Sequence, residues 1–209
     1  MPRFRTPLER RLWLLGAGVV VFIYAAAYFV QFLLDALRTR GLLAAAVWGT
    51  VIVAAAAAAA FVVRARPGRW EVALLFAAAG AYLLFLRRLD IVQERIHLIE
   101  YGAVGGLAYA ALCERWGSPG VNVGDTANDR ERPRWQRWPA FWAIVIATAA
   151  GWGDELVQAM LPNRHYDLRD VATNAEAAAL LVLVLAARRK LRATAAQRAS
   201  VPQADQART

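Results

Sequence analysis

The chain has 209 residues, of which 59% are hydrophobic and 20% are charged, and its mean hydropathy is +0.34. Apolar runs of about 18 residues or longer recur along it, which excludes an ordinary soluble domain and indicates an integral membrane protein. The net charge of +9 comes largely from arginines at the ends of these runs, as the positive-inside rule requires, so the expected partner is the lipid bilayer and not nucleic acid.

Six apolar segments follow one another along the chain. A helix crosses a bilayer core of about 30 Å with about 20 residues, so the first, second and fifth segments are long enough alone and the others need flanking residues. The sequence therefore predicts an all-α polytopic membrane helix bundle of six transmembrane helices, or of five if one short segment lies in the interface. The segments are residues 12–34, 42–63, 70–86, 96–113, 138–161 and 171–187.

The distribution of basic residues predicts the orientation. With the N-terminus in the cytoplasm, the inner segments carry 18 of the 25 Lys and Arg residues and the outer segments carry 7. This bias favours six spans with both termini in the cytoplasm. The polar end of the chain lacks aromatic residues and is expected to be disordered. The predicted divisions are 1–89 for the first three helices, 90–192 for the last three and 193–209 for a disordered cytoplasmic tail.

Ionisable and other polar residues lie inside three of the apolar segments. A charge at mid-bilayer costs about 2.5–3.5 kcal/mol on insertion scales, so such residues are candidates for function. They occupy the start of the fourth segment, the end of the fifth and the start of the sixth, which the predicted topology places on one extracytoplasmic face. The residues are Glu94, His97, Glu100, Tyr101, Asp154, Glu155, Gln158, Asp170, Asn174 and Glu176, and the linking loop adds Arg164 and Asp167.

Helical spacing places several of these side chains on shared faces. Asp154 and Gln158 are four residues apart, as are Asp170 and Asn174, and residues so spaced are neighbours on a helix. Glu155 should point about 100° away from Asp154, toward a different neighbour.

Small residues predict where the backbone meets a neighbour closely. Gly151 and Gly153 flank Trp152, so they permit a kink or a close approach. Gly102 and Gly106 form a G-x-x-x-G pattern, which predicts helix packing.

Three interpretations of the polar group stay open: a buried ion-pair network, a binding site and a catalytic site. No metal site or cofactor is predicted, because the chain has two histidines, one cysteine and no H-E-x-x-H motif. Mg²⁺ or Ca²⁺ at the acidic cluster stays an alternative. The candidate catalytic residues are His97, Asp154 and Asp170. The candidate ligand-binding residues are Glu100, Tyr101, Glu155, Gln158, Arg164, Asp167 and Asn174.

The polar pattern resembles the VanZ-like family of bacterial integral membrane proteins. The match is Asp154-Glu155-x-x-Gln158 followed by Arg164-x-x-Asp167-x-x-Asp170-x-x-x-Asn174, with "ERIHLIEYG" (94–102) upstream. It covers residues 90–187, about half of the chain, and the ordered polar set is its most specific part. Two positions depart from the family pattern. Asn163 stands where the family often has glycine in Pro-Gly-Arg, and Ala177 stands where it often has glycine after the Asn.

The resemblance implies a role in the bacterial cell envelope and a location in the plasma membrane, and it names no reaction. The founding member is associated with low-level resistance to teicoplanin, so a link to glycopeptide-type antibiotic resistance is an open expectation for this chain. The expected function is binding of a lipid-linked or anionic cell-envelope ligand in an extracytoplasmic polar pocket. The alternatives are a membrane-embedded hydrolase or transferase acting on a lipid-linked substrate and, third, a transporter.

Overall fold

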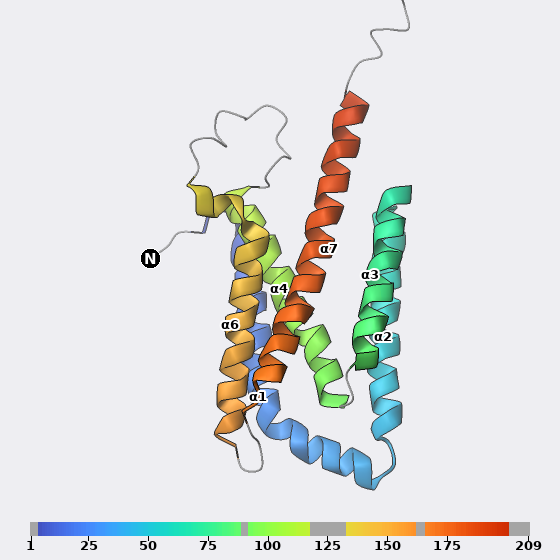
Figure 1. Ribbon diagram of the computed structural model, residues 1–209, viewed down its shortest axis with the longest axis vertical. Helices are drawn as coiled ribbons and strands as arrows, with labels where there is room; N and C mark the ends of the chain where they lie inside the picture. The colour runs from blue at the N-terminus through green and yellow to red at the C-terminus, as the bar shows by residue number, and fades with distance from the viewer. Residues whose placement is uncertain (1–3, 89–91, 118–132, 162–165, 201–209) are drawn as a thin grey trace, which may run out of the picture.

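Figure 1 shows the protein as a computed structural model, which describes residues 4–88, 92–117, 133–161 and 166–200. These residues form helices and contain no strand, so the predicted all-α class is confirmed. The helices are α1 (Pro7–Thr39), α2 (Leu43–Ala65), α3 (Arg69–Arg88), α4 (Val92–Trp116), the short 3₁₀-helix η1 (Arg134–Arg137), α6 (Pro139–Ala159) and α7 (Leu168–Ser200).

Five of the helices in the described ranges, α1, α3, α4, α6 and α7, are long and apolar enough to cross a membrane. The apolar stretch of α2 is shorter, at 43–57. Many of the large apolar side chains on the outer helices are exposed, for example Phe22, Ile52 and Phe76. Exposed apolar side chains of this number suit a bundle surrounded by lipid.

The first helix begins five residues before the apolar segment that predicted it. The Thr6 hydroxyl accepts a hydrogen bond from the Glu9 backbone N–H at 3.0 Å, and the Glu9 carboxylate accepts one from the Arg5 N–H at 2.7 Å. This capping box, with Pro7 in the first turn, satisfies N–H groups that have no partner inside the helix. Capping therefore sets the helix start, and hydropathy does not.

The last helix continues to Ser200, so the predicted disordered tail is wrong for residues 193–200. The eight residues after Arg192 include four alanines, a glutamine and an arginine, which are good helix formers. These residues extend α7 because their helix propensity is high, although they show no apolar pattern. Residues 201–209 of the predicted tail lie outside the described residues.

The central helix of the bundle is α4, which packs against α7, α1 and α6. Its contact with α7 is close because α4 presents small residues there. A methyl group built on Gly105 would lie 3.1 Å from the Ala178 Cβ, and one on Gly106 would lie 3.2 Å from the Leu181 Cδ2. The packing role predicted for Gly102 and Gly106 is confirmed, and Gly105 between them adds to it.

Two buried acids near one end of the bundle are paired with arginines. Arg115 on α4 donates to Glu9 on α1 at 2.8 Å. Arg188 and Arg192 on α7 donate to Glu71 on α3 at 3.0 and 2.9 Å. These pairs join helices at the end where α1 begins and α4 ends.

Candidate functional site

The helix ends that carry the predicted polar residues lie at the same end of the bundle. There α4 begins, α6 ends and α7 begins, and the first residues of α1 lie at the opposite end (Figure 1). The convergence follows from up-and-down connectivity, because consecutive helices run in opposite directions. Polar residues from stretches more than 50 residues apart in sequence, His97 and Asp154, thereby become neighbours.

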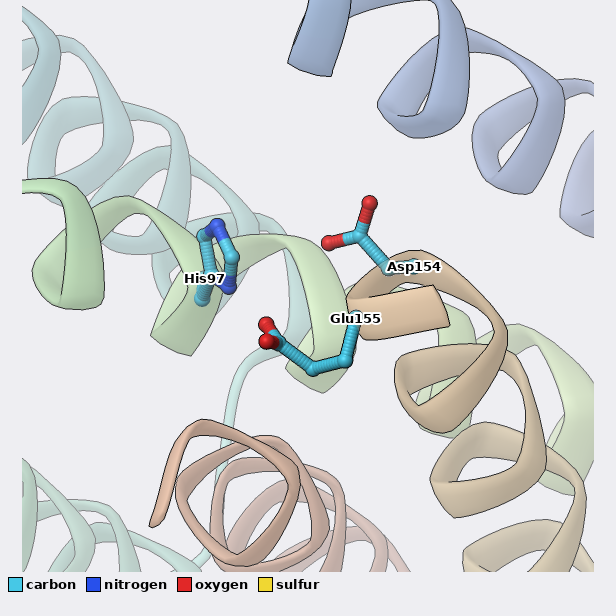
Figure 2. A group of neighbouring side chains, drawn as sticks. All are labelled: His97, Asp154 and Glu155. Carbon is cyan, nitrogen blue, oxygen red and sulfur yellow. The ribbon is translucent and has the colours of Figure 1, made fainter. Parts of the chain in front are cut away.

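A histidine from α4 and two acids from α6 form the centre of the site. Figure 2 shows His97, Asp154 and Glu155 pointing toward one another from these two helices. One ligand atom of each side chain lies within 4.8 Å of those of the other two. Asp154 and Glu155 are 0% and 1% exposed, and His97 is half-buried. Two carboxylates and an imidazole thus share a space largely closed to solvent.

Hydrogen bonds orient both carboxylates. The Gln158 Nε2 atom, one helical turn after Asp154, donates to the Asp154 Oδ2 at 3.0 Å. The Asp167 backbone N–H, just before α7, donates to the Glu155 Oε2 at 3.4 Å. The carboxylate of Glu155 is therefore held by the segment that follows α6, and that of Asp154 by its own helix.

Tyr101 closes one wall of the site. Its side chain is 0% exposed, and its ring centroid lies 5.9 Å from that of His97. The two are four residues apart on α4, which places both rings on one helix face. Glu100, also on α4, is half-buried.

The first helix supplies a residue that the sequence did not single out. The Tyr24 hydroxyl donates to the Ala150 carbonyl at 2.7 Å and lies directly against Gly153. A side chain at position 153 would occupy the place of this hydroxyl, so the glycine permits the close approach that the sequence predicted. Tyr24 lies inside an apolar run rich in aromatic residues, and nothing in that pattern distinguishes it from its exposed neighbours.

A second glycine brings α6 against α7. A methyl group built on Gly151 would lie 2.8 Å from the Asn174 Cβ. Asn174 is 0% exposed, and neither polar atom of its side chain has a hydrogen-bond partner among the described residues. Its amide is thus a buried polar group beside α6. Thr173, which the sequence did not single out, is also buried.

We expect Gly151→Ala to lower the free energy of unfolding by about 1–3 kcal/mol, the usual effect of overpacking. The Asn174 Cβ is attached directly to the α7 backbone, so it cannot rotate away from the new methyl group. Thermal unfolding in detergent micelles measures the change. The control is Gly80→Ala on α3, where no atom lies within 4 Å and alanine is the better helix former. Equal melting temperatures for Gly151→Ala and the wild type would contradict the close packing.

Several predicted residues lie outside the central group. Asp170, predicted to be catalytic, is half-buried in the first turn of α7 and does not belong to the His97 group, in which Glu155 is the second acid. Glu155 meets a neighbour of its own, the Asp167 N–H, as predicted, and its carboxylate also shares the space of Asp154 and His97. Asp167 is exposed and caps α7, with its Oδ1 accepting from the Arg169 N–H at 2.8 Å. Arg164 lies outside the described residues, as does the side chain of Glu94.

Comparison of the chain with models of protein families, with curated proteins and with solved structures gives no match. The chemistry of the site therefore follows from its geometry alone. An imidazole beside carboxylates can accept a proton or ligate a cation, and the buried amide and hydroxyl groups can hydrogen-bond a polar ligand.

Proposed function

We propose that the chain is a VanZ-like integral membrane protein of the bacterial cell envelope. In this proposal six helices cross the plasma membrane, both termini are cytoplasmic, and the polar site opens to the extracytoplasmic side. The site binds a lipid-linked or anionic cell-envelope ligand. The observation that supports this most directly is the gathering of Asp154, Glu155 and Asn174, all at most 1% exposed, at one end of an apolar bundle.

A binding role explains this group better than a purely structural role does. The acids that fasten helices together in this protein, Glu9 and Glu71, each accept hydrogen bonds from arginine at 3.0 Å or less. Asp154 and Glu155 lie together with His97, with one ligand atom of each side chain within 4.8 Å of those of the other two. Placing two carboxylates side by side away from water is unfavourable, and buried groups of this kind are found at functional sites.

The proposed orientation is supported by where the basic residues lie. Arg115, Arg188 and Arg192 pair with acids at the end of the bundle opposite the site. Arginines gather on the cytoplasmic side of bacterial membrane proteins. The site would then face outward, where cell-wall precursors are used.

The ligand in this proposal has an anionic group and hydroxyl groups. Arg164, which follows α6 in the sequence, and Arg169, in the first turn of α7, suit a phosphate or carboxylate because the guanidinium group binds such groups bidentately. Tyr101, Gln158 and Asn174 suit the hydroxyls of a sugar-bearing headgroup. The ligand tail would lie along the apolar outer surface of the bundle.

Binding of a polyprenyl phosphate, compared with phosphatidylglycerol, tests the proposal. We expect wild-type protein in native mass spectrometry to retain the polyprenyl phosphate, and Glu155→Gln to bind it at least about 10-fold more weakly, because a hydrogen bond to a charged carboxylate is replaced by one to a neutral amide. Glu176→Gln is the matched control, since Glu176 is exposed on α7. Equal binding by Glu155→Gln and wild type, or no binding by either, would overturn the proposal.

The orientation has its own test. Tyr166→Cys places a thiol at a position that is 39% exposed near the site, and Thr194→Cys places one in the exposed far part of α7. The native Cys113 is buried and should stay unlabelled. We expect a membrane-impermeant maleimide added to intact cells to label residue 166 and not residue 194. The reverse pattern would invert the topology.

A catalytic role is the second candidate, because His97 lies within reach of two carboxylates that could orient it as a general base. In this alternative the site hydrolyses or transfers a group on a lipid-linked substrate. Release of inorganic phosphate from a polyprenyl diphosphate by the wild type and not by His97→Gln would favour catalysis over binding alone.

A further inference from the structure

We propose that His97, Asp154 and Glu155 hold a divalent cation and that Zn²⁺ is the cation that fits them best. The cation site rests on the geometry of these three residues. Its role in presenting positive charge to an anionic headgroup rests on the proposed function.

The donor atoms are close enough to share one ion. Zn²⁺ binds imidazole nitrogen and carboxylate oxygen at about 2.0–2.2 Å, so two ligand atoms of one tetrahedral ion stand about 3.4 Å apart. The donor atoms of His97, Asp154 and Glu155 lie within 4.8 Å of one another. Rotation about the side-chain bonds of Glu155 and His97 would have to bring the donor atoms up to about 1.4 Å closer when the ion binds.

The charge of the site favours a cation. Asp154 and Glu155 are adjacent in sequence, almost fully buried, and aimed at the same space. Two carboxylates in such a space repel each other and lose hydration, and a divalent ion compensates both effects at once. The half-buried imidazole of His97 next to them adds a nitrogen ligand, and an imidazole ligates a metal in its neutral form.

The surrounding polar groups point to a ligand independently of the acids. Tyr101 and Asn174 are both 0% exposed, and neither polar atom of the Asn174 side chain has a hydrogen-bond partner among the described residues. Tyr101 lies beside both His97 and Asp154. A hydroxyl in this place suits a water or phosphate oxygen bound to the ion.

Both carboxylates are already oriented by hydrogen bonds, as the carboxylate ligands of a metal ion usually are. Gln158 holds one oxygen of Asp154, and the Asp167 N–H holds one oxygen of Glu155. Such outer hydrogen bonds orient ligating carboxylates in metal sites generally.

The ligand set favours Zn²⁺ over Mg²⁺ and Ca²⁺. Imidazole nitrogen is a good ligand for Zn²⁺, whereas Mg²⁺ and Ca²⁺ prefer oxygen ligands and higher coordination numbers. Three protein ligands around Zn²⁺ leave a fourth position open. In the proposed function, that position receives an oxygen of the anionic ligand.

Metal analysis of the full-length protein in detergent tests the site. After treatment with EDTA and addition of Zn²⁺, we expect about one bound ion per chain and a raised melting temperature. His97→Gln and Glu155→Gln should each weaken Zn²⁺ binding by on the order of 100-fold, and Glu176→Gln should bind as the wild type does. Far-ultraviolet circular dichroism and gel filtration check that each variant is folded, with Asp154→Asn as a further variant.

Three outcomes would overturn the cation site. They are no Zn²⁺ retained by the wild type, unchanged affinity in folded His97→Gln and Glu155→Gln, and tighter binding of Mg²⁺ or Ca²⁺ that does not depend on His97. Measuring polyprenyl phosphate binding with Zn²⁺ and with EDTA separates the two proposals. Zn²⁺ binding without any lipid binding leaves the cation site and removes the proposed function. Equal lipid binding in both buffers removes the role of the cation in recognition.

Discussion

Gly105→Leu is expected to prevent the bundle from closing and to yield aggregated protein. A methyl group at this position already lies 3.1 Å from the Ala178 Cβ, 3.2 Å from the Ala178 Cα and 3.2 Å from the Val182 Cγ2. The Cα is backbone, so it cannot rotate away, and leucine adds three more carbons. Separating α4 from α7 opens the most extensive contact among the described helices. We expect a loss of at least about 3 kcal/mol, the upper part of the usual range for overpacking.

Gel filtration and thermal unfolding in detergent measure this effect, with Gly80→Leu as the control. Gly80 lies within α3 and has no atom within 4 Å of a built methyl group, so leucine there should face lipid without strain. A monodisperse Gly105→Leu protein that melts within about 2 °C of the wild type would show that α4 and α7 are not packed in this way.

Hydropathy was enough to predict the helices but not all of their ends. The start of α1 depends on Thr6 and Glu9, a capping pair that lies before the apolar run. The end of α7 depends on the helix propensity of residues 193–200. These residues are too polar for hydropathy to identify them as part of a transmembrane segment. Both are local backbone effects, and a pattern of apolar side chains carries no information about them.

The sequence was enough to predict most residues of the site, but not how their side chains are arranged in space. The cost of placing Asp154, Gln158 and Asn174 in an apolar helix marks them as candidates without any structure. Which acid faces His97 depends on how α6 is rotated about its axis relative to α4. Spacing along the sequence does not show which of two consecutive acids faces the neighbouring helix. The approach of Tyr24 depends on how α1 packs on Gly153, a contact between residues more than 120 positions apart.

The double variant Asp154→Asn, Glu155→Gln should be more stable than the wild type and inactive in binding. Both replacements keep an oxygen that can accept the hydrogen bonds from Gln158 and from the Asp167 N–H. They remove two facing charges from a space that is almost closed to solvent. Neutral side chains should therefore stabilise the bundle by about 1–3 kcal/mol in a buffer with EDTA, which keeps divalent ions away from the site.

Thermal unfolding in EDTA, together with native mass spectrometry of bound polyprenyl phosphate, tests both halves of this expectation. The matched control is Asp35→Asn with Glu176→Gln, which removes two exposed acids and should change neither quantity. A drop in the melting temperature of the site variant would mean that Asp154 and Glu155 fasten the helices together, as Glu9 and Glu71 do. A rise with loss of binding would mean that the chain keeps these charges at the expense of its own stability, which is the pattern of a site retained for its ligand.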